Sequence, residues 1–481
     1  MLSRVSGRIT TKSQFRFTTL RAQLHDLIYR DDKSSDLYKL AAGCPKTAVG
    51  QQGNEIREQE RRYEVSKLSN GITVLTESAS SPSRVDVGIL LDLGTRDETN
   101  ETSGSLLSIK NTYYKSVLNT NETINYGVIQ QSGGEFEMDY DQESVYFKAH
   151  CLAHDVVDVF KVVADCALEP RSVVAANAAI EKNYGTHNLE NIIKSGEAFN
   201  EAIFKTAFGL TGLGMPLRGF KNNIGNLSAY NIQKFQLENI NPSRIIVTGA
   251  GIYNHSEFVS LAQDTLSFIS AGQSTKTRTQ TQYIGGEVRN LTDDNEIAIG
   301  LLFPSANWSS SQAAVFQVLN ALLGQTGSSQ SRLQRNILNK NSYADVVESL
   351  NFTFSDAGLF GVKVIGSADK GSELLLSVLN ELKSLTGSIS NSELTRAKQI
   401  LKTQLFFALE RTADRLEEAA KNLKIFKAIK LNEYASYIDA VTSDQVNKAV
   451  IDLLKTRPSL VAEGGLANRL PTYDQLLNQL K

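Results

Sequence analysis

The chain has 481 residues, of which 41% are hydrophobic and 21% are charged, a balance typical of soluble globular proteins. Its formal net charge of -2 argues against a broad electrostatic attraction to nucleic acid or acidic lipid. The length exceeds one ordinary core, so we expect two or more domains. Three cysteines are too few for a disulfide framework. No apolar run approaches the roughly 18–20 residues needed to cross a bilayer, so a role at a membrane would depend on other subunits for attachment.

The first 24 residues differ in composition from the rest of the chain. They contain several Ser and Thr, no acidic residue, and the basic residues Arg4, Arg8, Lys12, Arg16 and Arg21. This composition is typical of a mitochondrial presequence, which we favour over an ordinary basic arm. Residues 25–60 are polar and mixed in charge, and we interpret them as an N-terminal arm ahead of the first domain.

Residues 61–270 predict a first α+β domain. A hairpin is expected over residues 63–77, because Asn70 and Gly71 lie between two segments rich in apolar residues. The remaining patterns predict a strand at 84–93, a helix at 103–118, an antiparallel pair at 135–140 and 143–150, a helix at 154–168, a strand at 242–249 and a helix at 256–270. Residues 271–281 are mostly Ser, Thr, Gln and Lys and predict a flexible linker.

Residues 282–481 repeat the order of the first domain. The segments 85–92, 140–150 and 241–248 correspond in pattern to 296–303, 354–364 and 457–464, with shifts of 211, 214 and 216 residues. A nearly constant shift across three strands implies an internal duplication of a unit of about 200 residues. Because strands and helices do not alternate strictly, we expect two homologous α+β domains, each a mixed or antiparallel sheet packed with helices, rather than a doubly wound fold.

Two short segments carry a family likeness, namely L-S-N-G-I-T-V at residues 68–74 and G-T-R-D-E at residues 94–98. With the duplication and the linker, they make residues 60–481 resemble the pitrilysin-type metallopeptidase superfamily. Within it, the chain is most similar to the branch of mitochondrial processing peptidase subunits and complex III core proteins. Active relatives carry the motif H-x-x-E-H early in the first domain and a further Glu about 76 residues downstream. In those relatives two His and the distal Glu bind zinc, and the motif Glu takes a proton from the zinc-bound water.

Residues 104–116, G-S-L-L-S-I-K-N-T-Y-Y-K-S, align with that motif but lack its chemistry. Leu107 stands at the first His, Lys110 at the catalytic Glu and Asn111 at the second His. A leucine cannot bind zinc, and a lysine repels the ion and cannot act as the general base for its water. The resemblance therefore implies an inactive homologue with no catalytic residue, no bound metal and no cofactor.

The distal zinc ligand has no counterpart in the aligned position either. That position falls near His187 and Asn188, neither of which is a carboxylate, and H-x-x-E-H occurs nowhere in the chain. Of the five histidines only His150 and His154 are close in sequence, and we favour a structural role for both over a metal site.

The resemblance leaves two inactive branches open. The core protein 2 branch of complex III implies a peripheral protein on the matrix side of the mitochondrial inner membrane. Its partners would be a sister core subunit, cytochrome b, cytochrome c1 and the small subunits of that complex. The alpha subunit of the processing peptidase implies a protein that recruits presequence peptides to a catalytic partner through a mobile glycine-rich loop.

The loop at residues 323–333 bears on this choice. It has two glycines, and the candidate peptide-binding residues in it are Gly324, Gln325, Thr326 and Gly327. Since a mobile loop relies on the conformational freedom of glycine, the small number of glycines in this loop favours the core protein 2 branch. Residues 354–361 and 464–474 also resemble core protein 2, and a single protein that serves both roles remains an open alternative.

Overall fold

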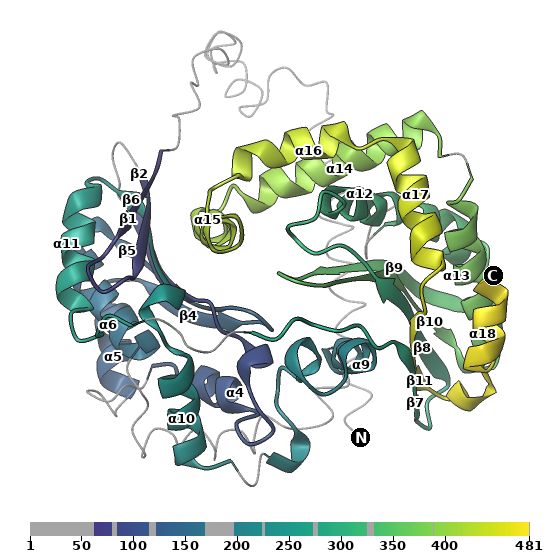
Figure 1. Cartoon of the computed structure of the whole chain (residues 1–481), viewed down its shortest axis with the longest axis horizontal. Coiled ribbons are helices and arrows are strands. Elements are labelled where there is room, and N and C mark those ends of the chain that lie inside the picture. The colour runs from purple at the N-terminus through teal and green to yellow at the C-terminus, as the bar shows by residue number, and fades with distance from the viewer. Residues whose placement is uncertain are drawn as a thin grey trace, which may run out of the picture. The chain divides into compact units, whose positions relative to one another are not determined.

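The computed structural model describes residues 62–78, 84–114, 122–168, 197–223, 227–272, 278–324, 331–387 and 389–480. These residues form two β-sheets, each with helices on both faces (Figure 1). Arg62–Lys481 make up one compact unit. The predicted presequence and the predicted arm lie outside the described residues.

The strands and helices have the following bounds. The first sheet contains β1 (Tyr63–Lys67), β2 (Thr73–Ser78), β3 (Arg84–Leu91), β4 (Glu135–Tyr140), β5 (Val145–Leu152) and β6 (Ile245–Ile252). The second contains β7 (Gly286–Leu291), β8 (Glu296–Pro304), β9 (Ala344–Thr353), β10 (Gly358–Ser367) and β11 (Ser459–Gly464). The helices are α4 (Ser105–Asn111), α5 (Glu122–Gln131), α6 (Val156–Leu168), α9 (Glu197–Phe208), α10 (Ala229–Asn239), α11 (His255–Thr265), α12 (Ala313–Leu323), α13 (Gly371–Ser384), α14 (Asn391–Ala408), α15 (Thr412–Phe426), α16 (Tyr434–Ala440), α17 (Ser443–Leu454) and α18 (Tyr473–Leu480).

Apart from β1, an additional edge strand of the first sheet, the two sheets share one strand order, which confirms the α+β class and agrees with the duplication expected from the sequence. The first sheet runs β1-β2-β6-β3-β5-β4 and the second β7-β11-β8-β10-β9. In both, the pair at one side is parallel (β2 with β6, β7 with β11) and the following pairs are antiparallel. The three strand pairs matched by sequence, β3 with β8, β5 with β10 and β6 with β11, occupy equivalent places. The domain boundaries drawn from the sequence stay predictions.

The central strands of the first sheet are buried on both faces. Along β3, Val85, Val87, Ile89 and Leu91 pack into the core that α6 and α11 cover, whereas Leu90 points to the opposite face. Successive side chains of a strand alternate between faces, so a strand covered on both sides reads as a continuous apolar run. This is why residues 84–93 were recognisable as buried from the sequence.

Each half of the described chain supplies a helix to the sheet of the other half. Helix α15 packs on the second face of the first sheet against β6, β3 and β5, and α9 packs on the second face of the second sheet against β11, β7 and β8. In the first contact Ala419 and Ala420 lie against Tyr146 and Ile246. The second contact is formed by a cluster of Phe199, Ile203, Phe204, Ala207, Phe208, Leu213, Leu302, Phe354, Leu359 and Val461. The two halves therefore share their apolar cores, and neither sheet is fully covered by its own half.

Some predicted bounds differ from the observed ones. The hairpin over residues 63–77 is confirmed, with Gly71 at a φ of 100° in the turn. The helix expected at 103–118 is shorter, because α4 ends at Asn111 and residues 112–114 form a turn. Helix α11 ends at Thr265 rather than at residue 270. Among the described residues, no helix combines the length and the apolar character needed to cross a membrane.

Candidate functional site

The helix that aligns with the zinc motif is α4, and its first turn is fixed by a buried carboxylate. Gly104 precedes the helix at a φ of 96°, and Glu98 accepts hydrogen bonds from the backbone N–H groups of Gly104 (3.0 Å) and Leu106 (2.9 Å). Burial raises the pKa of Glu98 to about 8, although these N–H groups act in the opposite direction. The turn at residues 94–98, which carries part of the family likeness, thus supplies the side chain that holds the first turn of α4.

The three degenerate motif positions lie on α4 as the alignment placed them. Leu107 and Asn111 are half-buried and Lys110 is exposed. The Lys110 ammonium lies 3.4 Å from a carboxylate oxygen of Asp139 and 5.5 Å from the centroid of the Tyr140 ring, both on β4. These contacts place a paired cation, rather than a free carboxylate, on this helix.

Of the other positions considered for a metal site, His150 and His154 lie within the described residues. His187 and Asn188 lie outside the described residues. His150, on β5, has its Nε2 atom 3.3 Å from Glu135, and His154 is exposed beside Asp155. Within the described ranges, no group of three or more His, Cys, Asp or Glu side chains is arranged to hold a metal ion.

The glycine-poor loop is described only at its two ends, residues 323–324 and 331–333. Gly324 follows α12 with a φ of 107°, and its carbonyl accepts hydrogen bonds from the backbone N–H and the hydroxyl of Ser349, both at 2.9 Å. Gln325, Thr326 and Gly327 lie outside the described residues, so their proposed contact with a peptide stays a prediction.

A cluster of charged side chains joins the two halves, and the sequence did not reveal it. Arg96 pairs with Glu143 and also with Asp356, at 2.9 Å. The backbone N–H of Ser355 donates to Glu143 (2.8 Å), and that of Thr281 donates to Asp356 (2.9 Å). Residues far apart in the chain are thereby tied at one place. No local sequence pattern predicts such a contact, because Arg96 and Asp356 are separated by 260 positions.

The same cluster anchors the end of the predicted linker. Arg278 lies 2.7 Å from Asp92 and 2.7 Å from Asp97, and Asp92 also lies 2.9 Å from Lys424 of α15. Burial alone would raise the pKa of Asp92, but the charges of Lys424 and Arg278 lower it to about 2. Residues 278–281 are therefore tied to both halves, and the expectation of a flexible connector does not hold for them.

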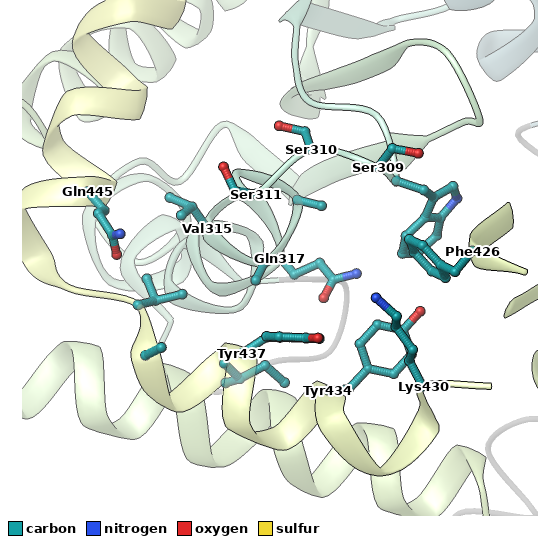
Figure 2. A pocket seen from close by; sticks show the side chains of 16 residues that line it. Ser309, Ser310, Ser311, Val315, Gln317, Phe426, Lys430, Tyr434, Tyr437 and Gln445 are labelled. Atoms are coloured by element: carbon teal, nitrogen blue, oxygen red, sulfur yellow. The ribbon is translucent and has the colours of Figure 1, made fainter. Parts of the chain in front are cut away.

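Two adjoining cavities lie between α12, α15 and α16. The larger has a volume of about 770 Å³, and its acidic wall consists of Asp414, Glu417 and Glu418. The smaller has a volume of about 360 Å³ and contains aromatic rings and one charged side chain, Lys430 (Figure 2). Burial raises the pKa of Glu418 above its ordinary value. These cavities are the concave sites that the sequence reasoning missed. Trp308, the single tryptophan of the chain, lines both cavities and is half-buried, and it is the one residue in their walls that stands out in the sequence.

The comparisons with known proteins agree with the fold. A sequence profile of the family described as "Peptidase M16 inactive domain" matches residues 226–401. The subunit beta of the mitochondrial-processing peptidase of Blastocladiella emersonii is 26% identical over 429 residues, which cover 86% of this chain and 91% of that protein. The alpha-2 subunit of the same peptidase from Dictyostelium discoideum is 26% identical over 446 residues, which cover 88% and 96%. Subunit 1 of the cytochrome b-c1 complex of Rattus norvegicus is 23% identical over 427 residues, which cover 86% and 88%. These matches support the family inferred from the sequence, that of mitochondrial processing peptidase subunits and complex III core proteins, to which the chain is similar over most of its length.

Proposed function

We propose that the chain is a noncatalytic core subunit of complex III, of the core protein 2 type. The observation that carries the proposal is α4, where Leu107, Lys110 and Asn111 occupy the motif positions and the Lys110 ammonium is paired with Asp139. A cation in place of the general base disfavours both zinc and the proton transfer that zinc-bound water requires. The chain would then act in assembly and stability rather than in catalysis.

The proposed role fixes a set of partners and a location. The chain pairs with a sister core subunit and contacts cytochrome b, cytochrome c1 and the small subunits of complex III. It lies peripherally on the matrix side of the mitochondrial inner membrane. The relatives described above are subunits of a mitochondrial peptidase or of the mitochondrial cytochrome b-c1 complex, which supports a mitochondrial location and a partner subunit.

A second candidate function is the substrate-recruiting alpha subunit of the processing peptidase. The larger cavity favours it, because the acidic side chains of Asp414, Glu417 and Glu418 line it and no Lys or Arg does so among the described residues. An acidic wall complements a basic presequence peptide. One chain with both roles would unite this cavity with membership of complex III.

Purification in mild detergent tests the two roles. A tagged chain is isolated from mitochondria, and the eluate is examined by haem absorbance and by cleavage of a presequence peptide. The core role predicts stoichiometric b and c haems. A haem-free complex of two chains that cleaves presequences would replace the core role by the alpha-subunit role.

Peptide binding separates the roles further. If the chain recruits presequences, Glu417→Gln lowers the affinity for a basic presequence peptide in fluorescence anisotropy, and the affinity of the unaltered protein falls steeply with salt. The matched control is Asp452→Asn, an exposed carboxylate on α17 that does not line the cavity. Equal affinities for the two variants and the unaltered protein would remove the support that the cavity gives to the second role.

The absence of catalysis has its own test. Zinc is measured by elemental analysis of the chain separated from its partner under native conditions. We expect less than one tenth of a zinc ion per chain and no presequence cleavage by the isolated chain. One zinc ion per chain, whose removal by a chelator abolishes cleavage, would refute the noncatalytic assignment.

A further inference from the structure

The smaller cavity between α12, α16 and the end of α15 has the form of a ligand site. Its volume of about 360 Å³ lies within the range of roughly 300–1,000 Å³ that small-molecule sites occupy. Ala314, Val315, Ile438 and Val441 form much of its apolar surface. The aromatic residues that line it are Trp308, Phe426, Tyr434 and Tyr437. Such a lining can bury the apolar or ring portion of a ligand.

Charge is distributed unevenly in this cavity. Lys430 is its single charged lining residue, and no Asp or Glu lines it among the described residues. The Lys430 ammonium lies 5.3 Å from the centroid of the Phe426 ring, and no ion pair of this ammonium occurs within the described part of the chain. In Figure 2 the ends of the Lys430 and Gln317 side chains project toward the same part of the cavity. A cationic donor and an amide donor thus converge beside the aromatic rings.

The neighbouring cavity has the opposite charge. It shares Trp308, Gln317, Tyr434 and Ile438 with the smaller cavity, but its charged lining residues are all acidic. A cationic ligand would therefore favour the larger cavity, and an anionic ligand the smaller one. Lys430 is half-buried and its ammonium is the one charge in the lining of the smaller cavity, so an anion is the kind of ligand that this cavity attracts.

We propose that the smaller cavity binds a small amphipathic anion, a carboxylate carried on an apolar body. The carboxylate accepts hydrogen bonds from the Lys430 ammonium and the Gln317 amide, and the apolar body lies against Trp308 and Tyr434. The serines at residues 309–311 line the cavity as well. This ligand is additional to the partners of the proposed function and does not depend on which of the two roles is correct.

Three probes of equal chain length test the charge preference. Decanoate, decanol and decylammonium are titrated by calorimetry, each below its micelle concentration, into the full chain with its copurified partners. We expect decanoate to bind at least about tenfold more tightly than decanol, because only the carboxylate can pair with the Lys430 ammonium. We expect decylammonium not to compete for the site. Equal binding of decanoate and decanol, or no binding of decanoate, would overturn the proposal.

Variants assign the binding to this cavity. Lys430→Met keeps the length of the side chain and removes its charge, so the preference for decanoate over decanol should disappear. Lys448→Met makes the same change at an exposed position of α17 outside the cavity and should leave the preference intact. Ala440→Leu fills the cavity from an exposed position without altering Lys430, and it should weaken decanoate and decanol alike. An unchanged preference in Lys430→Met would overturn the assignment.

The carboxylate could be free in solution or belong to a lipid, and a vesicle arm distinguishes these sources. Phosphatidylcholine vesicles with and without a fifth of phosphatidylserine are sedimented with the protein and with Lys430→Met. Loss of lipid-dependent sedimentation in Lys430→Met would identify an anionic lipid as the source. Binding of decanoate without any sedimentation that depends on Lys430 would identify a free carboxylate, and either result supports the site.

Discussion

One buried ion pair holds α15 of the second half to the first sheet. The Arg415 guanidinium lies 2.7 Å and 2.9 Å from the two carboxylate oxygens of Glu77 on β2, and both side chains are 7% exposed. Arg415 also donates to the carbonyl oxygens of Leu409 (2.7 Å) and Glu410 (3.2 Å). All three nitrogens of the guanidinium are therefore used, and the pair fixes the start of α15 relative to the sheet.

Replacing Arg415 tests how much this contact contributes. Arg415→Met preserves most of the apolar volume but leaves the Glu77 carboxylate buried without its cation, which costs about 3–5 kcal/mol. An unfolding entropy of about 2.1 cal/mol/K per residue over about 420 residues makes each kcal/mol equivalent to about 1 °C. We therefore expect Tm to fall by about 3–6 °C in calorimetry. The control Arg411→Met removes a guanidinium that is 83% exposed and lies 3.6 Å from Asp414, so it should cost less than about 1 kcal/mol.

A second replacement separates the cost of an unpaired charge from the contribution of the pair. Glu77→Leu combined with Arg415→Met removes both charges, and such double replacements by apolar residues are often neutral. We expect the double variant to recover most of the Tm lost in Arg415→Met. If Arg415→Met lowers Tm no more than Arg411→Met does, Glu77 and Arg415 are not a buried pair in solution and the placement of α15 is wrong.

Two further predictions concern titratable groups in the first half. The raised pKa of Glu98 means that the folded state holds a proton that the unfolded state releases above about pH 4.5, so stability is greatest below that pH and falls as the pH rises toward about 8. In Glu98→Gln this pH dependence of Tm should flatten. An unaltered slope would show that another group causes it. The lowered pKa of Asp92 has the opposite sign, because its stabilising effect is present above about pH 3.8 and is lost as the pH falls toward about 2. Arg278→Met removes one of the cations that lower this pKa, so acid unfolding followed by circular dichroism should begin at a higher pH, whereas Arg457→Met, which alters a guanidinium outside this cluster, should leave it unchanged.

The regular elements could be predicted because their signals are local. The hairpin at residues 63–77 is specified by Asn70 and Gly71, and the buried strands by apolar runs that reflect burial on both faces. The duplication was also readable, since corresponding strands keep nearly the same spacing in both halves. The ends of the helices were predicted less accurately than the helices themselves. Helix α4, for example, ends at Asn111 although its apolar pattern continues.

The contacts between the halves could not be predicted, because they join segments with no shared local pattern. The apolar stripe of α15 could equally have covered its own sheet, and only the folded chain shows that Ala419 and Ala420 face the first sheet. Likewise, Arg96, Arg278 and Asp356 are ordinary surface residues by sequence, and their burial follows from how the halves meet. The family likeness located α4 but gave no information on the cavities, whose walls come from several helices.

The exchange of helices makes one element serve two purposes. On α15, Ala419 and Ala420 pack on the first sheet, while Glu417 and Glu418 line the larger cavity and Phe426 lines the smaller one. A ligand that binds only when α15 is packed on the first sheet stabilises that packing. By linkage, a variant in which α15 is held less firmly must bind the ligand with lower affinity. We therefore expect Arg415→Met to lower the affinity of the smaller cavity for decanoate, although Arg415 does not line it, and decanoate to raise the Tm of the unaltered protein. If Arg415→Met lowers Tm but leaves the affinity for decanoate unchanged, the cavity forms independently of the contact with the first sheet, and the two purposes of α15 are not coupled.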